Sequence, residues 1–236
     1  YYQQCSVLTF SYDDGYSYGY SVYGTYQDNV VRNPIATGVL EVVAPATSSD
    51  FISCGDFIDG VLYGIEYGTN NVYVINGDGT MILYGTLTGV SSVNGFAYDQ
   101  ANGVVYAADF NGTSSDLYTV NGDLSCNFVG NIGASALIIG LATDANGDLF
   151  GIDLASNSFM SIDKTTGAGT VIGSGLGINI NYAQDIGGDK VNDVIYGALY
   201  TTEGGWYTID KTTGAATLIN TTSNEVTLCA IYSELT

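Results

Sequence analysis

Four aspartates are the first candidates for chemistry in this chain. Asp59, Asp99, Asp144 and Asp185 lie at or near the ends of short apolar runs, so they could surround one end of a channel. Glycoside hydrolysis needs two carboxyl groups about 5–10 Å apart. However, Asp followed after two residues by Asn-Gly is also turn chemistry, in which the side chain bonds to the local backbone. No Arg or His lies nearby to tune a carboxylate pair, so we expect no catalytic residue and rank a glycoside hydrolase last.

Two turn-like runs also carry the hard oxygen donors that calcium prefers. They are Asn76–Gly79 and Asp144–Asp148, and neither completes a calcium-binding EF-hand loop because the distal Glu is missing. A hairpin turn with Gly at positive φ explains both runs equally well. We therefore expect no dedicated metal site and no cofactor, with at most weakly held Ca²⁺. The weak candidates are Asp78, Asp144, Asn146 and Asp148.

The cysteines and two glycosylation triplets indicate an extracellular protein. The chain begins at Tyr1 without Met, which we take as the sign of a removed signal peptide. The four cysteines, Cys5, Cys54, Cys126 and Cys229, form no CxxC pair. An even count in a secreted chain favours two disulfides, and three pairings are open. Asn111 and Asn220 begin Asn-x-Thr triplets, where an N-linked glycan can be attached.

Tyrosine is concentrated near the N-terminus. Eight of the 20 tyrosines fall within the first 26 residues, and Tyr16, Tyr18 and Tyr20 alternate with small residues. Alternate residues line one face of a strand. Such a row either packs in the core or builds an interface or sugar-binding surface, where tyrosine is common. The interface candidates are Tyr1, Tyr2, Tyr12, Tyr16, Tyr18 and Tyr20.

The charge balance removes several classes of function. Four Lys and Arg stand against 24 Asp and Glu, which gives a net charge of −20, and there is no His. Four cations cannot neutralise a phosphate backbone, so we expect no nucleic-acid partner. Repulsion likewise opposes an anionic membrane surface, and we expect no membrane insertion because no long apolar run exists. Without His there is no imidazole acid–base group or His-bound zinc.

An internal repeat organises the chain. Aromatic residues followed by Gly or Ala begin at positions 23, 63, 106, 150 and 196, which are 40, 43, 44 and 46 residues apart. Each pair opens a module of short apolar runs rich in β-branched and aromatic residues and bounded by Gly, Asn and Asp. The two clearest copies each contain a Lys-Thr-Thr-Gly turn, at residues 164–167 and 211–214.

These modules predict an all-β fold with about four strands per repeat. No window keeps a helical period, and a further apolar segment precedes each aromatic pair. Four antiparallel strands in a repeat of this length form one blade of a β-propeller. We therefore predict a single domain over residues 1–236 with five four-stranded blades, and six blades as the alternative. Residues 1–22 form a Tyr-rich N-terminal segment, and residues 226–236 form a closing or exchanged strand.

The repeated motifs resemble a group of secreted β-propellers. The runs Leu149–Asp153, Trp206–Asp210 and Thr212–Ile219 are similar to repeats of propellers from bacterial and environmental genomes, many without an assigned function. The resemblance covers roughly residues 20–232. It implies an extracellular propeller and brings no catalytic residue with it.

The ends of the chain lead to a functional hypothesis. Six segments are candidates for innermost strands, yet five blades need only five. They are residues 5–12, 51–57, 95–99, 139–144, 182–186 and 226–232. A surplus terminal strand can pair with a neighbouring copy, which gives a filament unless the rotation closes. We therefore expect a non-enzymatic subunit of an extracellular filament or surface assembly whose partner is a second copy of itself. A carbohydrate-binding, lectin-like propeller that binds glycans is the alternative.

Overall fold

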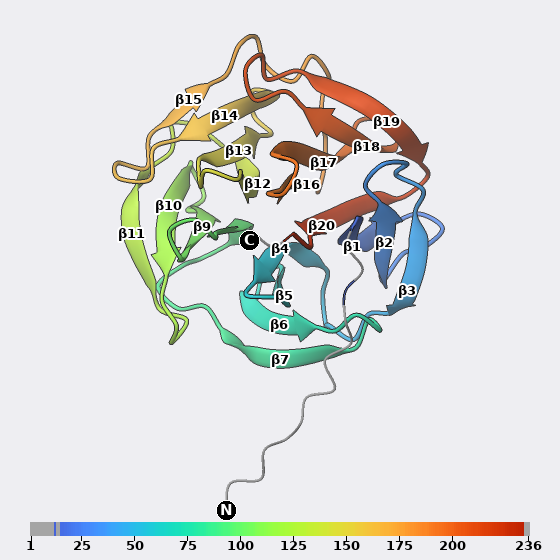
Figure 1. Ribbon diagram of the computed structural model, residues 1–236. Coiled ribbons are helices and arrows are strands. Elements are labelled where there is room, and N and C mark those ends of the chain that lie inside the picture. The colour runs from blue at the N-terminus through green and yellow to red at the C-terminus, as the bar shows by residue number, and fades with distance from the viewer. Residues whose placement is uncertain (1–11, 13–14, 234–236) are drawn as a thin grey trace, which may run out of the picture.

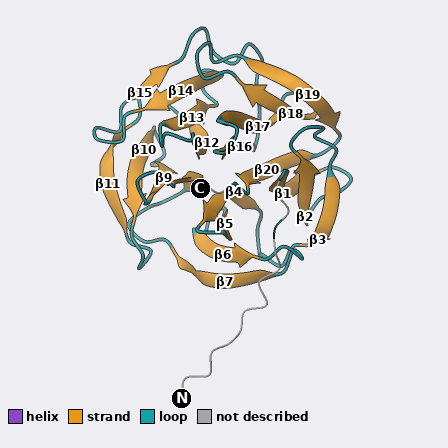
Figure 2. Cartoon of the chain, in the orientation of Figure 1, coloured by secondary structure: helices purple, strands orange, loops and turns teal. Residues whose placement is uncertain are grey.

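Five four-stranded antiparallel sheets surround a central axis (Figure 1). The computed structural model describes residue 12 and residues 15–233. Figure 2 shows strands and loops throughout this part of the chain, and no helix in it is long and apolar enough to cross a membrane. The protein is a five-bladed β-propeller, so the predicted fold class is confirmed and the six-bladed alternative is wrong.

Each blade is described from the axis outward. Blade 1 contains β20 (Glu225–Ile231), β1 (Tyr16–Tyr23), β2 (Asn29–Pro34) and β3 (Glu41–Pro45). Blade 2 contains β4 (Ile52–Ile58), β5 (Val61–Glu66), β6 (Asn71–Ile75) and β7 (Met81–Thr86). Blade 3 contains β8 (Val93–Asp99), β9 (Val104–Phe110), β10 (Ser115–Val120) and β11 (Cys126–Asn131). Blade 4 contains β12 (Ile138–Thr143), β13 (Leu149–Asp153), β14 (Ser158–Ile162) and β15 (Gly169–Val171). Blade 5 contains β16 (Asp185–Asp189), β17 (Val194–Tyr200), β18 (Gly204–Ile209) and β19 (Ala216–Thr222).

The C-terminal strand closes the ring within its own chain. β20 pairs antiparallel with β1, with Ser17 opposite Ile231 and Tyr18 opposite Ala230. Hydrogen bonds between the two ends of the chain therefore complete blade 1 and leave no open inner edge. Five of the six candidate inner segments occupy the inner strands, although β16 begins three residues later than expected, at Asp185. The sixth candidate, residues 5–12, lies outside the described residues except for Tyr12.

The aromatic-glycine pairs mark the second strand of each blade, with one correction. Tyr63, Tyr106, Phe150 and Tyr196 lie on β5, β9, β13 and β17 as the repeat predicts. In blade 1 the equivalent pair is Tyr18-Gly19, not the predicted Tyr23-Gly24, which lies at the end of β1. A Cβ on Gly19 would lie 2.7 Å from Cγ1 of Val226 on β20, so this position requires glycine. The many tyrosines of the segment had hidden the correct register.

The core lies between neighbouring blades. Leu117, Ile138 and Leu149 from blades 3 and 4 are buried against one another, and comparable clusters fill the other junctions. The outer parts of blades 3 and 4 also touch through backbone atoms. A Cβ on Gly130 would lie 1.8 Å from the carbonyl oxygen of Thr166 in the Lys-Thr-Thr-Gly turn. Close packing of this kind fixes the angle between blades.

The cysteine prediction is wrong for the described residues. Cys54, Cys126 and Cys229 are all free thiols, and Cys5 lies outside the described residues. Two disulfides would require a bond between two of these three. Cys126 lies on an outermost strand, whereas Cys54 and Cys229 lie on innermost strands. Three strand spacings of about 4.8 Å separate these layers, so Cys126 cannot reach either of the other two. Cys54 and Cys229 share the innermost layer but are also unbonded.

Candidate functional site

Two of the four candidate aspartates act as structural ties. Asp99 and Asp144 follow the innermost strands of blades 3 and 4 and accept hydrogen bonds from backbone N–H groups of their own turns. Lys164 Nζ lies 2.7 Å from Oδ2 of Asp99, and Lys211 Nζ lies 2.7 Å from Oδ2 of Asp144. Both lysines come from the Lys-Thr-Thr-Gly turn of the following blade. These carboxylates therefore link neighbouring blades and are not available as a catalytic pair.

The weak calcium candidates gain no support from the geometry. Oδ1 of Asp78 accepts hydrogen bonds from the backbone N–H and the hydroxyl of Thr80, as expected of a turn. Asp144 is already paired with a lysine, and Asn146 and Asp148 lie exposed beside it. Within residues 12 and 15–233 no three acidic or cysteine side chains form a group that could hold a metal ion.

Asp185 lies deep in the propeller, so its predicted place at the channel mouth is wrong. It is the first residue of β16 and is fully buried, and its two oxygens accept hydrogen bonds from the backbone N–H of Ile186 (2.9 Å) and of Cys229 (3.1 Å). Burial, reinforced by nearby Asp56, raises the pKa of Asp185 well above its usual value despite these hydrogen bonds. The neutral acid is therefore favoured there. In blade 5 the turn position equivalent to Asp99 is filled by Asp189.

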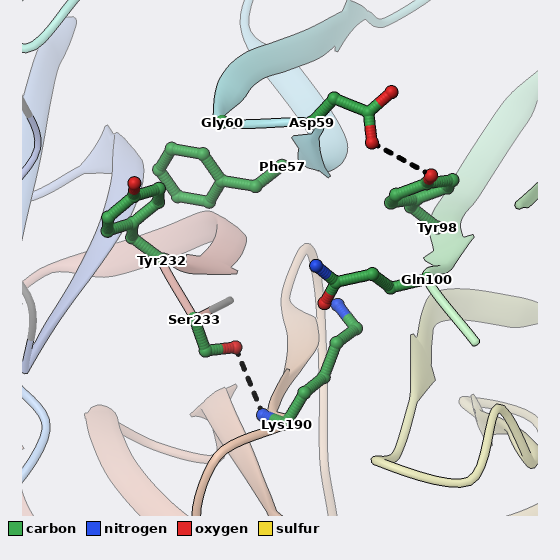
Figure 3. A pocket seen from close by; sticks show the side chains of 8 residues that line it. All are labelled: Phe57, Asp59, Gly60, Tyr98, Gln100, Lys190, Tyr232 and Ser233. Carbon is green, nitrogen blue, oxygen red and sulfur yellow. Dashed lines mark hydrogen bonds between the residues drawn. The ribbon is translucent and has the colours of Figure 1, made fainter. Parts of the chain in front are cut away.

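A hollow opens where the innermost strands end (Figure 3). Its volume is about 260 Å³, and we call it the Lys190 mouth. Its walls come from blades 1, 2, 3 and 5, so it lies on the propeller axis. It is lined by Phe57, Asp59, Gly60, Tyr98, Gln100, Lys190, Tyr232 and Ser233.

Two opposite charges face the Lys190 mouth. The Lys190 side chain is only 3% exposed, and its Nζ lies 3.5 Å from Oδ2 of Asp56. Its backbone N–H donates to the hydroxyl of Ser233 at 3.0 Å, which ties blade 5 to the residue that follows β20. On another side of the mouth, Oδ1 of exposed Asp59 accepts a hydrogen bond from the Tyr98 hydroxyl at 2.9 Å (Figure 3).

Sequence reasoning selected Asp59 but missed Lys190. The signal was the variation at one position of the repeat. This position comes directly after the residue that opens the turn at the end of each innermost strand. This position holds Asp59, Gln100, Ala145, Lys190 and Ser233 in the five blades. Because these residues differ from blade to blade while the flanking strands repeat, the ring breaks its symmetry at this mouth.

The opposite end of the channel has a different character. A hollow of about 320 Å³ lies where the innermost strands begin, and we call it the Phe51 mouth. Phe51 and Tyr67 stack there with ring centroids 4.8 Å apart and an angle of 14° between the rings. Asn94 adds an amide group to the lining, whereas the amide of Gln184 is buried and bonded to the backbone of Asn181, Tyr182 and Tyr200. Aromatic faces beside amides suit a neutral, polyhydroxylated ligand better than a charged one.

The outer rim of the ring is apolar. Each of the five outermost strands exposes at least one large apolar side chain: Val42 on β3, Ile82, Leu83 and Tyr84 on β7, Phe128 on β11, Val171 on β15 and Leu218 on β19. β7 stands out because its three residues are consecutive and 53–57% exposed. Successive residues of a strand point to opposite faces, so both faces of β7 are open to solvent.

The row of alternating tyrosines on β1 belongs to the core and not to an interface. Tyr18 and Tyr20 are 2% and 3% exposed, so their predicted interface role is wrong. Tyr16 is half-buried beneath the Arg32 guanidinium, which lies 4.5 Å from its ring centroid. Tyr12 packs edge-on against Tyr18 and Phe57, and its hydroxyl donates to the backbone oxygen of Ile75. Tyr1 and Tyr2 lie outside the described residues.

The two glycosylation candidates lie in different settings. Asn111 is exposed in the turn between β9 and β10, where its amide nitrogen donates to Asp116 at 2.8 Å. Asn220 is half-buried on the outermost strand β19, opposite Trp206. Trp206 itself is buried on β18 and stacks on Tyr196, which places it in the core.

Comparisons with known proteins support the fold. No protein-family profile and no curated protein sequence matches the chain. Similar solved structures include a protein of unknown function from Bacteroides thetaiotaomicron, with 14% identity and a TM-score of 0.53 over 86% of this chain and 49% of that one. This chain thus spans about half of that protein's length.

Two further similar structures differ in function from each other. One is a chain of a nidogen/laminin complex, with 14% identity and a TM-score of 0.59 over 94% of this chain and 82% of that one. The other is a gluconolactonase from Xanthomonas campestris, with 14% identity and a TM-score of 0.56 over 92% of this chain and 80% of that one. At such identity the likeness shows the fold alone.

Proposed function

We propose that this protein is a non-enzymatic, extracellular subunit that assembles with copies of itself by strand addition. The observation that carries the proposal is the composition of blade 1, whose innermost strand is β20 of the same chain. All five inner positions are therefore filled without residues 5–12, which read Cys-Ser-Val-Leu-Thr-Phe-Ser-Tyr. Because Tyr12 packs within its own chain, the donor in this proposal is residues 5–11, which are uncharged and alternate apolar and small polar residues from Leu8 onward, as a strand does.

The acceptor in this proposal is the edge of β7. It contains no charged residue and no proline, whereas natural edge strands are usually protected by such residues. Its exposed Ile82, Leu83 and Tyr84 offer apolar contacts on both faces. A donated strand would form main-chain hydrogen bonds along the free edge and bury these side chains.

Strand addition also suits the charge of the protein. Two subunits of net charge −20 repel each other, although salt screens this beyond about 8 Å. An uncharged segment on an uncharged edge brings no like charges into contact. Because donor and acceptor are different surfaces, the contact is heterologous and continues into a filament unless the rotation closes.

The experiment is electron microscopy and light scattering of the full chain and of three variants. Deleting residues 1–11 removes the donor, and I82K/L83K places a charge on each face of the acceptor. V171K/L218K is the matched control, because it charges exposed apolar positions on the outermost strands β15 and β19. We expect filaments from the full chain and the control, and monomers with unchanged circular dichroism from the other two. Filaments from the deletion variant, or loss of assembly in the control alone, would overturn this donor and acceptor.

A second candidate, glycan binding, is favoured by the Phe51 mouth. The stacked Phe51–Tyr67 pair presents a flat apolar surface beside the amide of Asn94. Sugar rings commonly lie on such surfaces while amides bond to their hydroxyls. A glycan array tests this function, with Tyr67→Ala as the variant expected to lose binding. Absence of saturable binding to any glycan would remove the candidate.

A further inference from the structure

Among residues 12 and 15–233, the ion pair of Lys190 is the longest. Lys164 Nζ makes short contacts with Asp99 (2.7 Å) and with the carbonyl oxygen of Gly147 (2.6 Å), and Lys211 is similarly paired at 2.7 and 2.6 Å. For Lys190 Nζ, which is more deeply buried, the contact is 3.5 Å to Asp56. Charge-assisted hydrogen bonds are normally about 2.7–2.9 Å long, so this contact is loose.

Asp56 is already occupied by other donors. Its Oδ2 accepts a hydrogen bond from the backbone N–H of Tyr98 at 2.9 Å, and its Oδ1 accepts one from the backbone N–H of Phe57 at 2.8 Å. These two bonds hold the carboxylate in place at 3.5 Å from the ammonium. A buried ammonium has three donors and a desolvation cost of several kcal/mol when poorly paired. The ammonium group of Lys190 thus has hydrogen-bond donors that the carboxylate of a bound ligand would satisfy.

The mouth also presents an acceptor. Asp59 lies in the tight turn between β4 and β5 with φ of 47°, followed by Gly60, and its carboxylate lies at the edge of the opening, turned toward Tyr98 (Figure 3). The Tyr98 hydroxyl fixes one of its oxygens. The other oxygen of this exposed residue has no hydrogen-bond or ion-pair partner among residues 12 and 15–233. Phe57 and Tyr232, whose ring centroids are 5.3 Å apart, form an aromatic wall beside both charges.

We propose that the Lys190 mouth binds a small amino acid as its zwitterion. The ligand carboxylate would bond to Lys190 Nζ, its ammonium group would face Asp59, and its carbon chain would lie against Phe57 and Tyr232. The net charge of −20 favours a zwitterion over a simple anion, because an anion is repelled by the protein before it reaches the mouth. The volume of about 260 Å³ accommodates a molecule of this size.

The test is calorimetric titration of the full chain with matched probes. Glycine, β-alanine and γ-aminobutyrate vary the separation of the two charges, while butyrate carries only the carboxylate and butylamine only the ammonium group. We expect saturable binding of at least one amino acid, and at least about 10-fold weaker binding of butyrate and butylamine. The D59N variant should lower the amino-acid affinity to that of butyrate, whereas D148N, an exposed turn carboxylate in blade 4, should change nothing.

K190M should abolish binding of every probe that carries a carboxylate. If K190M fails to fold, the D59N variant and the probe series decide the question. Equal binding of butyrate and the amino acids would overturn the zwitterion in favour of an anion site. Tighter binding of butylamine, or no saturation by any probe up to about 50 mM, would also overturn the proposal.

Discussion

Glu66 provides the sharpest test of how the blades are joined. Its fully buried carboxylate ties the loop from blade 1 to the β5–β6 turn of blade 2. Oε1 accepts hydrogen bonds from the backbone N–H groups of Ser49 (2.7 Å) and Asp50 (3.1 Å). Oε2 accepts hydrogen bonds from Thr69 Oγ1 (2.6 Å) and Asn71 Nδ2 (3.0 Å). Burial acts to raise the pKa of Glu66, but these hydrogen bonds outweigh it and lower the pKa to about 2.

The magnitude follows from this pKa. A carboxylate with a pKa of about 2 when folded and 4.5 as the reference value adds roughly 3 kcal/mol to stability at neutral pH. This contribution is complete above the unfolded pKa and is lost as the pH falls from about 4.5 through about 2. In Glu66→Gln, one acceptor oxygen becomes a donor amide. We expect a loss of roughly 2–3 kcal/mol at pH 7, which lowers Tm by about 5–10 °C in a protein of this size.

Urea unfolding followed by circular dichroism from pH 7 to pH 2.5 measures this effect. The free energies of unfolding of wild type and E66Q should differ most above about pH 5 and converge toward pH 2.5. D148N, which also replaces a carboxylate by its amide, should stay within about 0.5 kcal/mol of wild type throughout. A change below about 0.5 kcal/mol in E66Q at pH 7, or a difference that is constant with pH, would refute the reasoning.

Two further predictions follow from packing and burial. Gly130→Ala should lower the free energy of unfolding by at least about 2 kcal/mol, because its Cβ would lie 1.8 Å from a backbone oxygen of blade 4. Gly122→Ala, where a Cβ meets nothing within 4 Å, should change it by less than about 0.5 kcal/mol, and equal losses in chemical denaturation would contradict the packing argument. Cys126, whose pKa burial raises to about 11, should be alkylated slowly in the native protein, yet well before fully buried Cys54 and Cys229. Mass spectrometry after timed iodoacetamide treatment checks this order, and earlier labelling of Cys54 would contradict it.

Most of the fold could be predicted because the signals in the sequence are local. Alternating apolar residues and turn residues repeat with each blade, so strand number and ring closure could be predicted from them. The aromatic-glycine pair of blade 1 was wrongly placed at Tyr23, because a tyrosine-rich strand offers several similar registers. Only the pairing with β20 selects Tyr18. The site was harder to predict. The depth of Asp185, the partner of Lys164 and the exposure of Lys190 depend on contacts between blades that spacing along the chain does not encode.

Mixing two assembly-defective variants tests the central claim most directly. The chain lacking residues 1–11 retains the β7 acceptor, while I82K/L83K retains the donor segment. Each variant alone should be monomeric by light scattering, and an equimolar mixture should form a one-to-one heterodimer that does not grow further. A mixture that stays monomeric while the wild-type chain forms filaments would contradict strand donation to β7. A wild-type chain that is monomeric at every concentration would contradict the assembly function itself.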